Sequence, residues 1–229
     1  HALRHYSQCI GGGHMCPDAG SFVLFAHGDW QICDGGYARK FTAFRNTVLV
    51  NGIGQTGEGG DWFECVALRR EKRGPRILRV DDTGKLAVIT GDATAAYEPQ
   101  AGLERFWRHV IHLRPDVWVL IDELSASCPS TFDLHFHSHG GELHTAEFKP
   151  DQPFTPDGPR AWITGGAHGR LRVTSLHPEQ VESFAEIQTI VDTGGQNERK
   201  MDLLRLRNTG PAKQVVFVTM LEAFPAQRN

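Results

Sequence analysis

The stretch RFWRHVIHLRPDVWVLIDE, residues 105–123, predicts the fold more clearly than any other part of the chain. It contains two apolar runs, RFWRHVIHL and VWVLIDE, which are joined by Arg114-Pro115-Asp116. Short apolar or alternating runs are typical of β-strands, and turn residues between two of them are typical of a hairpin. We therefore expect two neighbouring antiparallel strands here.

Runs of the same kind follow one another along most of the chain. They are SFVLFAH, DWQICD, NTVLVNG, DWFECVAL, RILRVDD, KLAVITGD, TFDLHFHSH, AWIT, RLRVTS, DLLRLRN and KQVVFVTML. His27-Gly28-Asp29, Asn51-Gly52 and Thr83-Gly84 separate neighbouring runs, and glycine-containing pairs of this type favour tight turns between strands. The stretch VESFAEIQTIV, residues 181–191, is compatible with a helix and equally with a strand.

The number and short spacing of these strands predict the fold class. We expect an all-β protein that forms a large antiparallel β-sandwich of two or more packed sheets. Residues 1–229 are assigned to a single sandwich domain, and residues 150–160 are expected to form a long loop.

Composition agrees with a globular domain and argues against several classes of partner. The chain is 40% hydrophobic and 22% charged, so it can bury a proper core. A net charge of −3 argues against a nucleic-acid partner, and no apolar run reaches the roughly 20 residues of a membrane helix. The 5 cysteines are scattered without a Cys-x-x-Cys pair, so we expect no disulfide framework. The chain starts at His1 and is interpreted as a fragment or processed form, from the bacterial periplasm or cytoplasm.

The stretch GGGHMCPDAGSF, residues 11–22, places three reactive side chains at every second position. In an extended chain His14, Cys16 and Asp18 share one face, and the glycines before them allow a bulky ligand to approach closely. A plain loop, in which Asp18 caps the turn and Cys16 is buried, explains the same residues.

A second polar segment, residues 31–64, combines strand ends with glycine-rich loops. Its polar and aromatic candidates are Asp34, Tyr37, Arg45, Asn46, Gln55, Glu58 and Trp62. Polar residues in such places are typical of sites on the rim of a rigid sandwich, although ordinary hairpin turns remain an alternative.

The stretch LHFHSH contains a third candidate. His135, His137 and His139 alternate along one strand face and suggest a metal site, because histidine is a common zinc ligand. We favour the simpler interpretation, in which these histidines line the solvated side of a half-buried strand. The basic residues of 68–79 are likewise interpreted as a solvated hairpin rather than a patch for an anionic polymer.

Taken in order, the motifs GGGHMCPDAGSFVLF, WQICDGGY and RNTVLVNGIGQTGEG resemble the C-terminal sandwich domain of heparinase II/III-like polysaccharide lyases, a group that includes alginate and oligoalginate lyases. The later strings GDATAAY and LERFWRHVIHLRPDVWVLIDEL resemble core strands of that family. The resemblance covers roughly residues 8–140. It implies a lyase domain that contributes to β-elimination in a polysaccharide containing uronic acid, an acidic partner.

The resemblance assigns roles to individual positions. His14 falls on a catalytic or charge-neutralising histidine, whereas Cys16 and Asp34 fall on two ligands of a zinc ion that some members hold. Arg45 falls on the third ligand, a histidine in the family, and an arginine cannot bind zinc because its guanidinium stays protonated. We therefore expect no cofactor and no tightly held zinc, and a structural zinc ion bound by the Cys16 thiolate is the alternative. An ion pair between Arg45 and Asp34 is expected to take over the structural role of the metal.

The remaining candidates complete the expected site. Tyr37 joins His14 as a catalytic candidate, and the substrate-binding candidates are Arg45, Asn46, Gln55 and Trp62. Full-length family members also have a helical toroid domain upstream of the sandwich, and no such domain is visible in this sequence. The resemblance therefore implies that the isolated chain is inactive. The alternative is a non-catalytic carbohydrate-binding or scaffold module, in which Trp30, Trp62 or Trp107 stack on sugar rings.

Overall fold

The computed structural model describes residues 15–59, 74–138, 154–192 and 194–226, which are built mainly from β-strands. The strands are β1 (Leu24–Ala26), β2 (Asp29–Ile32), β3 (Val48–Val50), β4 (Arg76–Asp82), β5 (Leu86–Asp92), β6 (Leu103–Leu113), β7 (Val117–Ser130), β8 (Phe132–Ser138), β9 (Thr155–Pro156), β10 (Ala161–Gly165), β11 (Gly169–His177), β12 (Val181–Val191), β13 (Glu198–Asn208) and β14 (Ala212–Pro225). The helical elements of this described part are three 3-10 turns, η1 (Thr42–Phe44), η2 (Thr94–Ala96) and η3 (Pro99–Ala101). Within the same ranges no helix has the length and apolar character needed to cross a bilayer.

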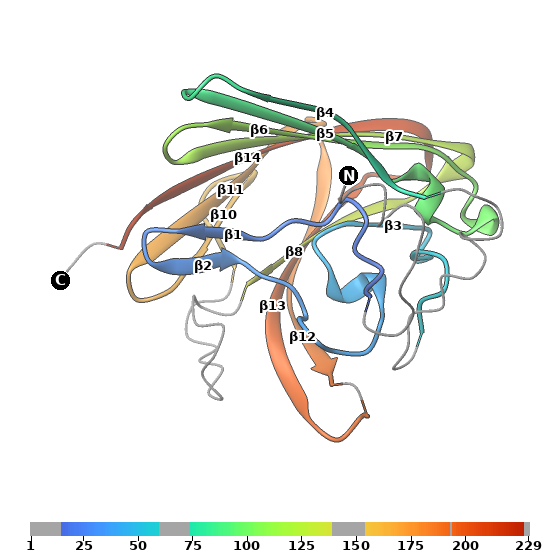
Figure 1. Cartoon of the computed structure of the whole chain (residues 1–229), viewed down its shortest axis with the longest axis horizontal. Helices are drawn as coiled ribbons and strands as arrows, with labels where there is room; N and C mark the ends of the chain where they lie inside the picture. The colour runs from blue at the N-terminus through green and yellow to red at the C-terminus, as the bar shows by residue number, and fades with distance from the viewer. Residues whose placement is uncertain (1–14, 60–73, 139–153, 193, 227–229) are drawn as a thin grey trace.

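The strands are arranged in an eight-stranded sheet, a four-stranded sheet and the β1–β2 hairpin (Figure 1). The order is β4-β5-β6-β7-β14-β11-β10-β9 in the large sheet and β12-β13-β8-β3 in the small sheet. All pairings between these strands are antiparallel. The expected all-β antiparallel sandwich is therefore confirmed.

One apolar core joins the inner faces of the two sheets. Phe106, Leu120 and Phe217 come from the large sheet, and Phe136 and Leu204 come from the small sheet. All five side chains have exposed fractions of 0%. Because burial of one such side chain stabilises a protein by roughly 1.5–3 kcal/mol, this core is the main source of stability for the sandwich.

The hairpins expected from the sequence are present. β1 and β2 pair around His27 and Gly28, whose φ angles of 53° and 84° belong to the left-handed region that tight hairpin turns require. The Arg114-Pro115-Asp116 turn joins β6 to β7, and Thr83-Gly84 joins β4 to β5. Asn51-Gly52 also forms a turn. The predicted strand at residues 61–68 lies outside the described residues.

Two further expectations concern segments near the C-terminal half. Residues 181–191 form a strand and not a helix, because all of them pair in register with β13. The expected loop at residues 150–160 contains the short strand β9, which pairs with β10 at the edge of the large sheet. Residues 150–153 of that loop lie outside the described residues.

The prediction that the histidines of β8 face solvent is wrong for the two that the structure describes. His135 is 4% exposed and His137 is 0% exposed, while their rings share one face at 5.9 Å between centroids, as the alternation predicted. The segment between β2 and β3 covers this second face, with Cys33 donating its backbone N–H to the carbonyl of His137. His139 lies outside the described residues.

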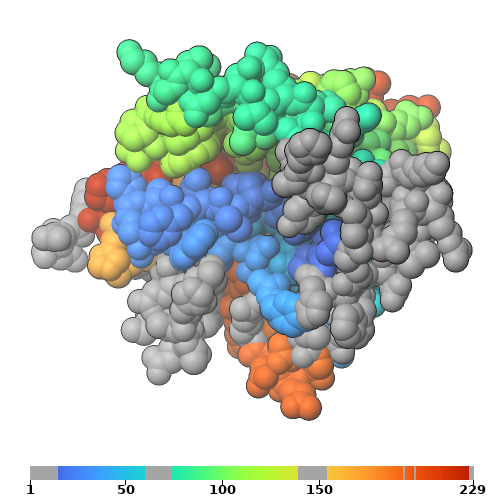
Figure 2. All heavy atoms as spheres, viewed as in Figure 1, coloured from blue at the N-terminus to red at the C-terminus, as the bar shows by residue number. Residues whose placement is uncertain are grey.

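The covering segment belongs to the N-terminal part of the chain. In Figure 2 the residues of the β1–β2 hairpin form a blue band between the green strands of the large sheet and the orange β12–β13 hairpin. The same part of the chain contains most of the polar candidates from the sequence.

Candidate functional site

The segment between β2 and β3 folds back on itself and brings the candidate residues together. Asp34 ends the β2 side, and its Oδ1 accepts the backbone N–H of Gly36 at 2.7 Å. The backbone N–H of Gly35 donates to Phe44 O at 2.8 Å, so the two arms of the loop are joined just before β3. A Cβ atom at Gly35 would lie 3.0 Å from the Phe44 Cβ, which explains the need for glycine at this crossing.

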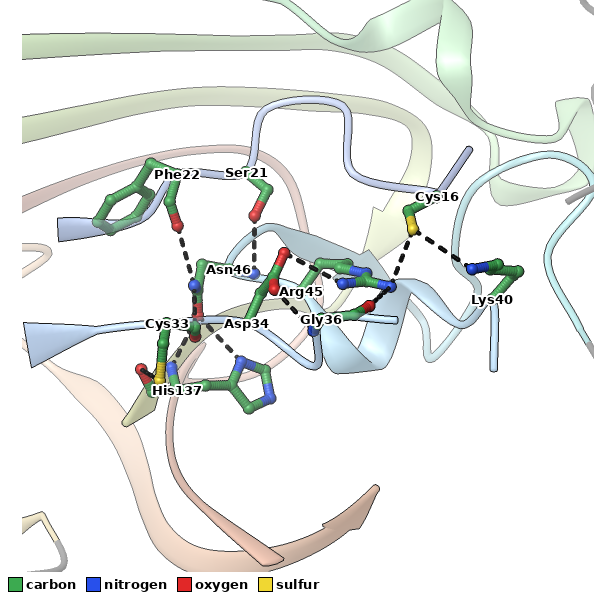
Figure 3. Close-up of polar contacts among 10 residues, drawn as sticks. All are labelled: Cys16, Ser21, Phe22, Cys33, Asp34, Gly36, Lys40, Arg45, Asn46 and His137. Carbon is green, nitrogen blue, oxygen red and sulfur yellow. Dashed lines mark hydrogen bonds and ion pairs between the residues drawn. The ribbon is translucent and has the colours of Figure 1, made fainter. Parts of the chain in front are cut away.

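Arg45 lies at the centre of this loop and contacts three parts of the chain (Figure 3). Its Nη1 lies 3.1 Å from Asp34 Oδ2, so the expected ion pair is confirmed. Its Nη2 donates to Gly36 O at 2.9 Å and to Cys16 Sγ at 3.1 Å. The Arg45 side chain is only 1% exposed, whereas that of Asp34 is 27% exposed. The pair therefore bridges the protein interior and the surface of the loop.

Lys40 is a second buried cation beside the same loop, and sequence analysis did not identify it. Its side chain has an exposed fraction of 0%, and its Nζ lies 3.8 Å from Cys16 Sγ. The same Nζ lies 4.1 Å from the centre of the Tyr37 ring. The Tyr37 side chain is 56% exposed, so the loop presents a phenol to solvent while the Lys40 ammonium lies against its ring.

Asn46 and Gln55, expected to contact a substrate, are instead internal supports. Asn46 is 0% exposed, and its Nδ2 donates to the carbonyls of Phe22 and Cys33 while its Oδ1 accepts the backbone N–H of His137 at 2.7 Å. Gln55 is 3% exposed and makes two hydrogen bonds to the backbone of Ala19. In this arrangement their amides are used by the protein itself, because buried polar groups need partners.

The two buried histidines lie under the covering segment. Burial lowers the pKa of His137 to about 3 and that of His135 to about 4. Both rings are therefore neutral at pH 7, and neither reaches solvent to exchange a proton with a ligand. Their place in the fold is structural.

A second support, also missed at the level of sequence, comes from the large sheet. Arg108 on β6 makes two contacts with Asp122 on β7, at 2.6 Å and 3.1 Å. Its Nη1 also donates to the carbonyls of Gly20 and Asn46, at 2.6 Å and 2.7 Å. The signal in the sequence was a charged residue between the inward apolar positions 106 and 110. This arginine anchors the polar segment on the sandwich.

The remaining candidates are the histidine and tryptophan residues and the metal site. His14 and Trp62 lie outside the described residues, so their positions relative to Tyr37 stay predictions. Trp30 and Trp107 are partly buried, with the Trp30 ring 5.3 Å from that of Phe25. Among the described residues no group of three or more His, Cys, Asp and Glu side chains has the arrangement of a metal site.

Comparison with a family model gives a match over most of the chain. The model described as "Heparinase II/III-like, C-terminal" matches residues 7–210. This range contains the whole polar segment, both sheets up to β13, and the strands that carry Arg108 and the buried histidines.

Comparison with solved structures shows the same fold. The chain is similar to heparan sulfate lyase HepC from Pedobacter heparinus, with a TM-score of 0.69, 16% identity, and coverage of 94% of this chain and 32% of that chain. It is also similar to a heparinase III, with a TM-score of 0.67, 14% identity, and coverage of 93% of this chain and 30% of that chain. The chain thus spans about a third of the length of these structures.

Proposed function

The chain belongs to the heparinase II/III-like C-terminal family, and on this basis we propose that it is the sandwich part of a polysaccharide lyase. The substrate class is an acidic polysaccharide that contains uronic acid. The reaction is β-elimination, in which the sandwich contributes one wall and some of the proton-carrying groups of the site.

The reaction sets clear requirements for that wall. The C5–H and C4–O4 bonds of the uronic residue break, a C4–C5 double bond forms, and the leaving O4 takes up a proton. The C5 proton is barely acidic because it lies beside a carboxylate, so hydrogen bonds or positive charge must stabilise the anion that develops there. A tyrosine or histidine removes the proton and another acid protonates O4. Neither step requires a redox cofactor.

The exposed phenol of Tyr37 is the observation that supports this role most directly. It projects from a glycine loop whose Gly36 carbonyl is held by the buried Arg45, and Lys40 lies against its ring. A proton carrier works best when its position is fixed before the substrate arrives. Tyr37 therefore carries a proton in the proposed reaction, together with His14, whose position lies outside the described residues.

The other groups of the site are expected from a separate part of the protein. The chain covers 32% of the HepC chain, so the larger part of that relative has no counterpart in this sequence. We propose that an upstream helical toroid domain forms the opposite wall of the cleft. The 229-residue chain by itself should then have almost no lyase activity.

The test compares the isolated chain with the longest natural form of the protein. Each is incubated with heparan sulfate and, separately, with alginate, and the ultraviolet absorbance of the unsaturated uronate is followed. We expect the absorbance to rise only with the longer form, and on one of the two polymers. Saturated products formed by hydrolysis, or no cleavage of either polymer, would contradict the proposal.

A non-catalytic carbohydrate-binding module is the second candidate, and one observation favours it. Phe25 is 57% exposed on β1 and makes an edge contact with Trp30, so the hairpin presents an aromatic surface to solvent. Such surfaces stack on sugar rings. Polysaccharide binding that Phe25→Ala abolishes, in a natural full-length protein without elimination activity, would favour this role over the lyase.

A further inference from the structure

We propose that Arg45 is a built-in cation that occupies the place of a bridging metal ion between Cys16 and Asp34. The two guanidinium nitrogens lie 3.1 Å from Cys16 Sγ and 3.1 Å from Asp34 Oδ2 (Figure 3). A thiol and a carboxylate are two groups that zinc commonly binds. Here one planar, charged group of the chain itself contacts both.

These residues do not fit a divalent metal ion. The guanidinium stays protonated in proteins and offers no lone pair for coordination. Its side chain is 1% exposed and is held by three partners, so it cannot move into solvent to make room. The Lys40 ammonium, 3.8 Å from the same sulfur, adds a second positive charge. A metal ion between Cys16 and Asp34 would therefore be repelled at short range in a poorly solvated place.

The guanidinium also does what a bridging ion would do for the loop. It connects Cys16 in the first segment, Asp34 at the end of β2, and the carbonyl of Gly36. Gly36 directly precedes Tyr37, so Arg45 acts as a positioning residue for the exposed phenol. A bridge made from the side chain is present whenever the chain is folded, and it does not depend on metal supply.

The variant Arg45→His tests whether the arginine side chain takes the place of a metal ion. A neutral imidazole at this position, with Cys16 and Asp34, would provide three zinc ligands around one point. We expect the wild-type chain to retain less than about 0.1 zinc per chain after dialysis, and the variant to retain about one, as for a structural site. The thermal unfolding temperature should fall in the metal-free variant and recover when zinc is added, whereas chelator should not affect the wild type.

Arg45→Gln provides the matched control, because it removes the same charge without adding a strong ligand. It should unfold at a similarly lowered temperature, and zinc should not restore it. Cobalt supplies a spectroscopic readout: Arg45→His should show a sulfur-to-cobalt absorption band that the additional change Cys16→Ser abolishes. A merely structural arginine would predict no difference between the histidine and glutamine variants.

Three results would overturn the proposal. One is a wild-type chain that retains one zinc ion through dialysis. Another is a folded Arg45→His chain that binds no more zinc than Arg45→Gln. If Arg45→His does not fold without metal, refolding is compared in zinc and in magnesium: recovery in zinc alone supports the proposal, and recovery in neither contradicts it. Because none of these measurements uses lyase activity, they stand apart from the proposed function.

Discussion

Arg108 and Arg45 are both buried arginines that pair with an aspartate, but they lie in different surroundings. Arg108 and Asp122 face each other directly across β6 and β7, with exposed fractions of 4% and 0%, and make two hydrogen bonds. Arg45 makes one contact with Asp34, whose side chain is 27% exposed, and uses its other contacts on Gly36 O and Cys16 Sγ.

Because of this difference, we expect the Arg108–Asp122 pair to contribute mainly to stability and the Arg45–Asp34 pair to contribute mainly to the position of the loop. Between the sheets, water cannot replace a lost partner, so the removal of either member leaves a buried charge without compensation. At the rim, water can solvate Asp34 if the pair is broken, and the main loss is the fixed position of the loop before Tyr37. Removal of the core arginine should therefore have the larger effect on the free energy of unfolding, and changes at the rim should mainly affect the reaction.

The largest effect is expected for Arg108→Met, which leaves Asp122 buried without its partner and frees the carbonyls of Gly20 and Asn46. The free energy of unfolding should fall by about 3–5 kcal/mol, as for other broken buried pairs. Urea unfolding of the 229-residue chain measures this change. The matched control is the double change Arg108→Met with Asp122→Leu, which should be less destabilised than the single variant. A loss below about 1 kcal/mol for Arg108→Met would remove the contrast with the rim.

The next effect concerns the rim itself. Tyr37→Phe in the longest natural form of the protein should lower turnover by about a hundredfold or more, because a proton carrier is lost. Since the side chain is 56% exposed, the free energy of unfolding should change by less than about 1 kcal/mol. His14→Ala is expected to behave in the same way. Steady-state kinetics and thermal unfolding separate the two quantities, and full activity of Tyr37→Phe would exclude its proposed role.

A smaller effect is expected from the buried histidines as the pH is lowered. Burial holds the pKa of His135 at about 4, below the ordinary value of 6.5 that it has in the unfolded chain. Between these values the unfolded chain binds a proton that the folded chain does not, so stability falls as the pH falls. The slope is about 1.4 kcal/mol per pH unit for each such group.

The histidine prediction is checked by urea unfolding between about pH 6 and about pH 4.5, which lies between the folded and unfolded pKa values of His135. His135→Gln should show a shallower fall in stability than the wild type. His168→Gln is the control for replacing a histidine that is exposed. Burial also raises the pKa of Asp202 to about 6, and this group acts in the opposite direction because its protonated form is favoured in the folded chain. Equal slopes for the wild type and His135→Gln would contradict the prediction.

The smallest effect is expected on the solvent side of the large sheet. Arg76 on β4 is paired with Asp92 at 3.3 Å, but its side chain is 69% exposed. Arg76→Gln should therefore change the free energy of unfolding by less than about 1 kcal/mol, since water already solvates the arginine and Asp92 Oδ1 keeps the backbone N–H of Thr94. A loss as large as that of Arg108→Met in the same urea experiment would show that burial does not explain the difference between ion pairs.

Local patterns in the sequence predicted most of the strands, and the order of the motifs predicted the family. The runs at 105–113 and 117–123 predicted β6 and β7, because a period of two places alternate side chains on the core face and glycine or proline marks the turn. The order of motifs between residues 11 and 59 predicted the family that the comparison shows. The Asp34–Arg45 pair was also predicted, because the resemblance places both residues on positions that bind zinc in some members of the family.

Tertiary structure alone decided which polar residues are available to a ligand. Alternation showed that His135 and His137 share a face, but whether that face meets water depends on a segment about 90 residues earlier in the chain, which covers it. The same non-local packing turned Asn46 and Gln55 from expected rim residues into internal supports. The sequence by itself determined most of the strands, their turns and the charged pair at the rim. Which polar residues are buried supports and which are exposed site residues depended on contacts between distant segments, because no local pattern shows which segment packs over a strand.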